Sequence, residues 1–413
     1  MNNVIQPVIL SPNARKDDDI KQKSVLLIGD WAYNIISTAK VFVNAGFKVD
    51  LISYNKIIKS NRYISSVFYS SYNHEVIQNF ILINKINEYS VVIVIDDFIL
   101  KYLVDAQDID NKIKLKLLPV ISLDNFCHIY SKIGLSAVFE AAGVFTPQYA
   151  VAQDVNDVLR FAQKYGIPLF VKQDSSSAGF GVFECKSIDF IKRLPSSLFE
   201  KPVLVQEKIN GTVIGVDAFY RDAQLIYYSY SERVLSSDND YGPSSVRRFR
   251  QVGDLGGSLY EELQKIGKVL GANGFANITA IQSRENNVRY YFEADMRPTA
   301  WVFIGKYIGL DLSDCIKRYY EYGEMLSAPL SVNNKFPLSV VLPLFFRMDY
   351  VDILLNKYNV WKYIYYTASG NINVYLKDRI ICSVVVMLNK ILPDYLFLLL
   401  KTAYHNIKKS KKY

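Results

Sequence analysis

The sequence predicts a mixed fold with α/β and α+β parts: an N-terminal doubly wound parallel domain, a longer domain of two α+β subdomains, and a C-terminal extension. Three observations support this prediction. Short apolar runs alternate with helical stretches at the N-terminus, strands and helices of unequal length follow, and the last part of the chain is rich in apolar and aromatic residues. The length of 413 residues suits two or three domains, because a domain averages roughly 150 residues.

The N-terminal domain is predicted to cover roughly residues 20–125. Its four expected strands are short apolar runs, at residues 24–29, 49–53, 90–95 and 118–121. A helical stretch at residues 31–45 joins the first two runs and gives the β-α-β unit that begins a parallel sheet. The first run ends at Gly29 without the G-x-G-x-x-G pattern of a dinucleotide site, so we expect a scaffold domain that forms one wall of a site.

The composition favours a packed cytoplasmic protein. Half of the residues are hydrophobic and 21% are charged, which argues against wholesale disorder. The four cysteines are far apart and form no C-x-x-C pair, so a zinc knuckle or redox dithiol is not expected. Residues 1–23 lack the apolar region of a secretory signal. The net charge of +8 gathers in a C-terminal lysine cluster and one loop without a recognition motif, so we expect no nucleic-acid partner.

The second domain is predicted over about residues 126–330. Its expected helices lie at residues 131–142 and 154–164, and its expected strands at residues 149–152, 167–172, 203–207, 276–283 and 288–298. Lys172 ends one of these strands and precedes a loop of small residues that includes Ser176, Gly179 and Gly181. Such a loop lets backbone N–H groups surround phosphate oxygens beside a fixed cation. Taken alone, a lysine followed by serines and glycines is more often an exposed turn. The interpretation as a phosphate site therefore depends on the motifs around it.

Two acids near the end of the domain carry the strongest chemical signal. Glu293 and Asp295 are two residues apart on an expected strand, so their side chains share a face. Magnesium prefers hard oxygen ligands and often takes two carboxylates together with phosphate oxygens. Arg297 is the next residue on that face, where a guanidinium can hold the γ-phosphate or an acyl-phosphate. The alternative is a solvated strand of ion pairs.

Taken in order, these features resemble the ATP-grasp superfamily, whose members include carbamoyl-phosphate synthases, biotin carboxylases and D-alanine ligases. The resemblance spans about residues 24–310 and implies ATP and Mg²⁺ as cofactors. It identifies Lys132 as the lysine of the opening helix and residues 204–211 (LVQEKING) as the adenine hinge. In that hinge, Glu207 and the backbone of Lys208 and Ile209 would meet the adenine.

The chain departs from the family pattern at three positions. Asp295 replaces an asparagine, and the preceding strand has no acid for a third metal ligand. Gln282 is our candidate for that ligand, with Thr279 as the alternative if the hairpin is shorter. Val213 replaces a glutamate after the hinge, and Asp217 is a guess for the ribose contact.

The resemblance implies an ADP-forming ligase that activates a carboxylate and joins it to an amine, with Lys172 and Arg297 as catalytic residues. An ATP-grasp phosphotransferase and a nucleotide-binding regulatory protein without turnover are the alternatives. The expected partners are therefore a small-molecule carboxylate and an amine. Four arginines, Arg233, Arg247, Arg248 and Arg250, form either a clamp for an acidic substrate or a solvated loop. His128 belongs to no motif, and we expect it on a helix surface or in packing.

The C-terminal extension, residues 335–413, contains an apolar stretch at residues 380–400 that is interrupted by Lys390, Pro393 and Asp394. The interruption argues against a single transmembrane span. A helical hairpin packed on the protein is favoured over a membrane-surface element assisted by the terminal lysines, and both stay open. The expected location is thus cytoplasmic, with a peripheral membrane contact and a homodimer both allowed.

Overall fold

The computed structural model describes residues 23–53, 61–68, 77–78, 80, 85–176, 179–236, 244–255, 257–327 and 330–343. The chain divides into two compact units, residues 1–340 and residues 341–413. Most of the predicted C-terminal extension, including its apolar stretch, lies outside the described residues. Within the described ranges, no helix has the length and apolar character needed to cross a bilayer.

The first sheet is parallel and lies near the N-terminus. Its order is β3-β2-β1-β4, formed by β1 (Ser24–Ile28), β2 (Lys48–Ile52), β3 (Ser66–Phe68) and β4 (Val91–Val94). Helix α1 (Ala32–Asn44) connects β1 to β2, as predicted. The fourth strand was predicted at residues 118–121, and this is wrong. Val120 forms only an isolated antiparallel bridge to Ala272, and the fourth strand of the sheet is β3.

Short helices accompany the parallel sheet, with η2 before β4 and the others after it. They are α3 (Asp97–Asp105), α4 (Asn111–Leu117) and the 3₁₀ helices η2 (Lys85–Glu88) and η3 (Leu123–His128). Asp96 caps α3 by accepting a hydrogen bond from the backbone N–H of Ile99 at 3.1 Å. The Asp96 side chain also accepts from the backbone N–H of Asp30 at 2.9 Å. Polar groups from two strand ends therefore meet at one edge of the sheet.

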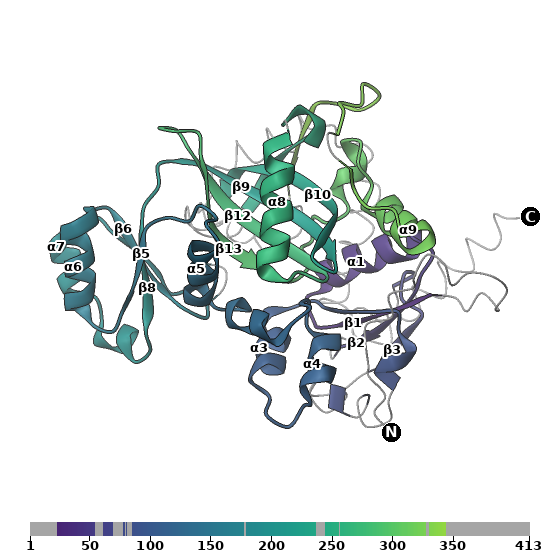
Figure 1. Cartoon of the computed structure of the whole chain (residues 1–413), viewed down its shortest axis with the longest axis horizontal. Helices are drawn as coiled ribbons and strands as arrows, with labels where there is room; N and C mark the ends of the chain where they lie inside the picture. The colour runs from purple at the N-terminus through teal and green to yellow at the C-terminus, as the bar shows by residue number, and fades with distance from the viewer. Residues whose placement is uncertain are drawn as a thin grey trace, which may run out of the picture. The chain divides into compact units, whose positions relative to one another are not determined.

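The second sheet is small and antiparallel, with the order β5-β8-β6-β7. Its strands are β5 (Tyr149–Ala152), β6 (Leu169–Gln173), β7 (Val182–Cys185) and β8 (Val203–Glu207). Helices α6 (Val155–Tyr165) and α7 (Ile188–Lys192) lie along this sheet, followed by η4 (Ser196–Phe199) (Figure 1). Val171 and Val205 belong to the apolar core on the helix-covered face. Because side chains alternate along a strand, Lys172 and Gln206 point to the opposite face.

The third sheet has the order β13-β12-β9-β10-β11-β14. Its strands are β9 (Gly211–Arg221), β10 (Gln224–Ser236), β11 (Ser244–Arg250), β12 (Phe275–Ser283), β13 (Arg289–Asp295) and β14 (Ser339–Pro343). The helices of this region are α5 (Lys132–Ala141), α8 (Gly257–Leu270) and α9 (Leu312–Tyr322), with η5 (Val252–Asp254) and η6 (Ile304–Tyr307). Figure 1 shows α8 lying across the sheet.

The two faces of the third sheet differ in chemistry. Val216, Ile278 and Ala294 contribute to the apolar core together with Leu263 of α8. The alternate positions include the polar residues Asp217, Asn277 and Thr279 together with both acids of β13. A parallel sheet followed by two antiparallel sheets confirms the predicted fold class. The domain boundaries themselves stay a prediction.

Candidate functional site

The N-terminus of α5 holds the start of the loop that follows β6. Ser131 caps the helix by accepting from the N–H of Gly134 at 2.9 Å, and its hydroxyl donates to the Asp174 carboxylate at 2.9 Å. The Lys132 ammonium donates to the backbone oxygen of Ser176 at 2.7 Å and to its hydroxyl oxygen at 3.0 Å. Lys132 and Ser176, both predicted site residues, are therefore brought together.

Gly134 allows α5 to approach η3 closely. A Cβ atom at this position would lie 1.8 Å from the backbone oxygen of Cys127, which no real contact permits. We expect Gly134→Ala to lower the free energy of unfolding by about 2 kcal/mol, because the backbone must move. Thermal denaturation would measure the loss. Gly257→Ala is the control, because a Cβ there meets nothing within 4 Å; equal melting temperatures for the two variants would contradict the prediction.

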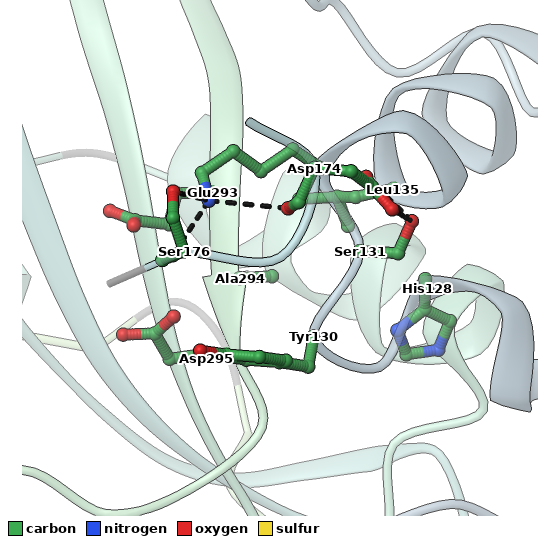
Figure 2. Close-up of a pocket in the computed structure, with 10 residues that line it drawn as sticks. His128, Tyr130, Ser131, Leu135, Asp174, Ser176, Glu293, Ala294 and Asp295 are labelled. Atoms are coloured by element: carbon green, nitrogen blue, oxygen red, sulfur yellow. Dashed lines mark hydrogen bonds between the residues drawn. The ribbon is translucent and has the colours of Figure 1, made fainter. Parts of the chain in front are cut away.

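Glu293 and Asp295 line one pocket with Lys132 and Ser176. Figure 2 shows both carboxylates pointing to the same side of strand β13, as their spacing predicts. The pocket is lined by residues from η3, α5, the loop after β6 and β13: His128, Tyr130, Ser131, Lys132, Leu135, Asp174, Ser176, Glu293, Ala294 and Asp295. Three acids and a lysine thus border one small space.

Partly buried Asp295 and buried Arg297 form a charge cluster. Burial raises the pKa of Asp295, Arg297 opposes that rise, and the charges of Glu293 and Asp97 add to it. The Arg297 guanidinium donates to both Asp97 oxygens, at 2.6 and 2.8 Å, and to Asp295 at 2.9 Å. Arg297 follows the end of β13 and is engaged by two carboxylates. These contacts are to acids from two parts of the chain, and a contact of Arg297 with a phosphate stays a prediction.

Lys172 lies between the second and third sheets. Its ammonium donates to the Gln206 side-chain oxygen at 2.6 Å and lies 4.9 Å from the centre of the Phe292 ring on β13. Burial lowers the pKa of Lys172 to about 8, while Glu293 raises it and Lys132 lowers it. The lysine strand and the acidic strand therefore face each other closely enough for their charges to interact.

The predicted hinge lies at the end of β8, outside this pocket. The backbone N–H of Glu207 donates to the oxygen of Gln148 at 2.8 Å, and the Lys208 ammonium pairs with Glu184 of β7 at 2.5 Å. Ile209 follows before β9 begins. None of these hinge residues lines the pocket that contains the acids. Their contacts with adenine stay a prediction.

The two glycines of the predicted phosphate loop adopt positive φ, +80° at Gly179 and +66° at Gly181. The backbone oxygen of Gly181 accepts from the N–H of Gln173 at 2.9 Å, so the loop returns to the end of β6. A Cβ at Gly181 would lie 2.2 Å from the Gln173 side-chain oxygen. Glycine is thus required at this return by conformation and by space.

The strand register does not place Gln282 beside the acids. Gln282 pairs with Arg289 and donates to the Asn287 side chain at 2.6 Å, at the hairpin end of β12. Thr279, our alternative, lies directly opposite Glu293. The register therefore favours Thr279 over Gln282 as the residue beside the acids, and the third metal ligand stays a prediction.

A buried polar row lies beside Thr279. Asn277 lies opposite Asp295 on one side and opposite Asp217 on the other. The Asp217 carboxylate accepts from Asn277 at 3.1 Å and from Thr299 at 2.7 Å, and burial raises its pKa. These contacts give no support to our guess of a ribose contact for Asp217.

The arginines at positions 233, 247, 248 and 250 lie on strands β10 and β11, so the alternative of a solvated loop is wrong, and the alternative of a substrate clamp stays a prediction. Arg247 of β11 is 13% exposed, lies 3.6 Å from the Asp217 carboxylate and stacks over Trp301 at 5.3 Å. Arg248 and Arg250 pair instead with Glu232, and both are more exposed. Arg233 lies opposite Arg247 in the register. Arg247 is the least exposed of the last three, and its guanidinium lies beside Asp217 on the polar face of the sheet.

Among the pocket residues that the sequence analysis did not assign to the site are His128, Tyr130 and Asp174. His128 is buried, its Nε2 lies 2.9 Å from the Leu270 oxygen, and burial lowers its pKa. It is therefore a packing residue and not a helix-surface residue. Tyr130 has a φ of 58°, which turns the chain from η3 into α5. The sequence signal for His128 and Tyr130 was their position just before the opening lysine, and that for Asp174 was its position two residues after Lys172.

No protein-family profile matches the chain. Over 121 residues it is 28% identical to D-alanine–D-alanine ligase B of Pseudomonas syringae pv. tomato. Over 185 residues it is 26% identical to the D-alanine–D-alanine ligase of Haemophilus ducreyi. These matches include 27% and 41% of this chain, and they span only 38% and 56% of the two ligases.

Solved structures are similar over most of the chain. The biotin carboxylase domain of Hydrogenobacter thermophilus 2-oxoglutarate carboxylase, solved with MgADP and bicarbonate, has a TM-score of 0.59 at 14% identity and covers 78% of this chain and 73% of its own. N5-carboxyaminoimidazole synthetase of Staphylococcus aureus, solved with ADP, has a TM-score of 0.59 at 13% identity and covers 82% of this chain and 86% of its own. At these identities the similarity establishes the fold alone.

Proposed function

The chain belongs by fold to the ATP-grasp superfamily, and from that premise we propose that it is an ATP-dependent, ADP-forming ligase. It activates a carboxylate as an acyl-phosphate and joins the acyl group to an amine. The observation that carries the proposal is the convergence of two strands: Glu293 and Asp295 share a pocket with Lys132, and Lys172 interacts with Glu293 from the facing sheet. A nucleotide cleft needs this combination of acids for a metal and cations for phosphates.

The donor set fits magnesium. Mg²⁺ is typically bound through one or two carboxylates together with waters and substrate phosphates. Within the described residues no group of three or more His, Cys, Asp or Glu side chains forms a metal cluster, so Glu293 and Asp295 would hold the ion as a pair. Bound there, the ion would supply positive charge to the phosphate oxygens. Arg297 holds the Asp295 carboxylate in place through a hydrogen bond of 2.9 Å.

The side chains of the site act by positioning and by charge. The substrate carboxylate attacks the γ-phosphorus in line, and Lys132 and Lys172 neutralise negative charge on the phosphate oxygens. ADP leaves, the amine attacks the acyl carbon, and inorganic phosphate is released. This route requires no covalent bond to the protein. The backbone N–H groups of Gly179 and Gly181 would contact the same oxygens.

One observation favours a second candidate, a nucleotide-binding protein without turnover. Arg297 donates three hydrogen bonds to carboxylates, so these donors of its guanidinium are engaged by the protein's own acids. A coupled assay for ADP release distinguishes the candidates. The assay supplies carboxylates together with amines, such as amino acids and amino sugars. Release that needs both substrates supports the ligase. Release with one acceptor and a phosphorylated product indicates a phosphotransferase, and MgADP binding without release indicates the regulatory protein.

Nucleotide affinity is expected to depend on the charge of Lys172. Burial lowers its pKa to about 8, so the side chain is charged at pH 7 and loses its charge as the pH rises through the pKa. We expect MgADP to bind about 10-fold more weakly at pH 9.5 than at pH 7, because one charged hydrogen bond disappears. Isothermal titration calorimetry measures this change. Lys172→Arg keeps its charge throughout and should remove the inflection; the same decline in that variant would contradict the assignment.

A further inference from the structure

Tyr130 has a backbone conformation that is unusual for a large side chain. Its φ of 58° lies in the left-handed region, which glycine and asparagine adopt far more readily than an aromatic residue. Strain of this kind persists where the surrounding structure holds the residue in place, and such residues cluster at functional sites. Tyr130 lies two residues before Lys132, at the turn from η3 into α5. The backbone strain is therefore located at the candidate site itself.

Contacts on both sides hold the turn at Tyr130 in this conformation. Before it, the buried His128 ring lies with its Nε2 2.9 Å from the Leu270 oxygen. After it, Ser131 caps α5. The backbone oxygen of Tyr130 itself accepts a hydrogen bond from the Ser175 hydroxyl at 3.0 Å. Because the flanking residues and the carbonyl are anchored, the turn fixes the direction in which the Tyr130 side chain leaves the backbone.

The side chain of Tyr130 extends across the pocket toward the acidic strand. Figure 2 shows its ring running from the turn toward Asp295, and both residues line the same pocket as Glu293. The ring is partly buried and packs against the apolar core. Asp295 also accepts a hydrogen bond from Arg297 at 2.9 Å, and its side chain is only 28% exposed. The surroundings of this carboxylate therefore include a guanidinium from its own strand end and an aromatic ring from the turn before α5.

We propose that Tyr130 is a positioning residue for Asp295: the left-handed turn directs its ring against this carboxylate, and the ring keeps water away from it and limits its rotation while the acid pair holds a divalent cation. This inference rests on the proposed function and gives a role to a residue outside the acid pair and the phosphate loop. A carboxylate that is shielded from water attracts a cation more strongly, and Mg²⁺ demands near-ideal geometry from its ligands. Replacing a residue that orients a metal ligand typically changes metal affinity by roughly 10–100-fold.

The first test needs no nucleotide. In protein labelled with fluorotyrosine, the ¹⁹F signal of Tyr130 is identified by its absence in Tyr130→Phe, and Mn²⁺ alone is then added as a paramagnetic probe. We expect Mn²⁺ to broaden the Tyr130 signal in the wild-type protein. The broadening should be lost in Glu293→Gln, because the acid pair then lacks one of its charges. A Tyr130 signal that stays sharp, or the same broadening in Glu293→Gln, would overturn the proposal.

The second test concerns affinity. Tyr130→Leu should weaken MgADP binding about 10-fold, while Tyr130→Phe keeps the ring and should bind within about 2-fold of the wild type. Tyr322→Leu is the control, because it makes the same exchange at a 66% exposed position of α9 and should leave the affinity unchanged. Tyr130→Met replaces the leucine variant if that one does not fold.

The outcomes separate the role of the ring from the proposed function. Wild-type affinity in Tyr130→Leu, or an equal loss in Tyr130→Phe, would reject the role of the ring. A wild-type protein that binds no MgADP would instead reject the proposed function, while the Mn²⁺ titration would still decide whether the Tyr130 ring lies against a cation site at Asp295.

Discussion

Glu293→Gln is expected to reduce magnesium-dependent ADP release by about 100-fold or more, because a metal ion contributes several kcal/mol of charge stabilisation in phosphoryl transfer. The amide keeps the shape of the side chain and removes its charge. Two neighbouring groups depend on the charge of Glu293. Its attraction raises the pKa of Lys172, and its repulsion raises the pKa of Asp295. The loss should be larger for turnover than for nucleotide affinity, which also depends on Lys132 and the loop.

The measurement is a coupled ADP-release assay over a range of magnesium concentrations. Glu285→Gln is a matched control, because Glu285 lies in the turn of the same β12–β13 hairpin and is exposed. We expect it to behave as the wild type. A Glu293→Gln variant with wild-type turnover and an unchanged magnesium dependence would remove this residue from the metal site. A loss that appears equally in both variants would point to the hairpin and not to the charge.

Much of the fold was predictable because the sequence signals were local. Apolar runs and alternating strands marked β1, β2, β4, β6, β8, β12 and β13, and Ser131 and Asp154 correctly marked helix starts as capping residues. The spacing of Glu293 and Asp295 was enough to place both on one face. Residues 118–121 have the same apolar character as a strand, but the chain continues directly into Ser122, which caps η3. Hydrophobicity alone does not distinguish a strand from a buried connection.

The remaining details of the site depend on geometry that one sequence does not encode locally. The choice between Gln282 and Thr279 depended on the hairpin length and on the register irregularity between Thr279 and Ala280. A shift of that kind changes which residue lies opposite a given acid. Arg297 and Asp97 are 200 residues apart in the sequence, and no local sequence pattern predicts their contact.

That contact gives the largest stability effect we expect in the described residues. Asp97, the first residue of α3, accepts two hydrogen bonds from Arg297, and both side chains are less than a tenth exposed. Removing one partner of a buried ion pair leaves the other charge poorly compensated, which costs about 3 kcal/mol or more. Asp295 still accepts from Arg297, so we expect Asp97→Asn to lower the free energy of unfolding by about 3 kcal/mol, the low end of that range.

Urea denaturation followed by tryptophan fluorescence measures this loss, and Trp31 provides a local signal because its ring lies 4.5 Å from the Arg297 guanidinium. Asp105→Asn is the control on the same helix: Asp105 pairs with Lys101 at a 59% exposed site, where an ion pair contributes roughly 0–1 kcal/mol. The Asp97–Arg297 pair joins α3, which follows the parallel-sheet strand β4, to the end of β13. If both variants unfold at the same urea concentration, Arg297 does not depend on Asp97, and the two regions are held together by apolar packing instead.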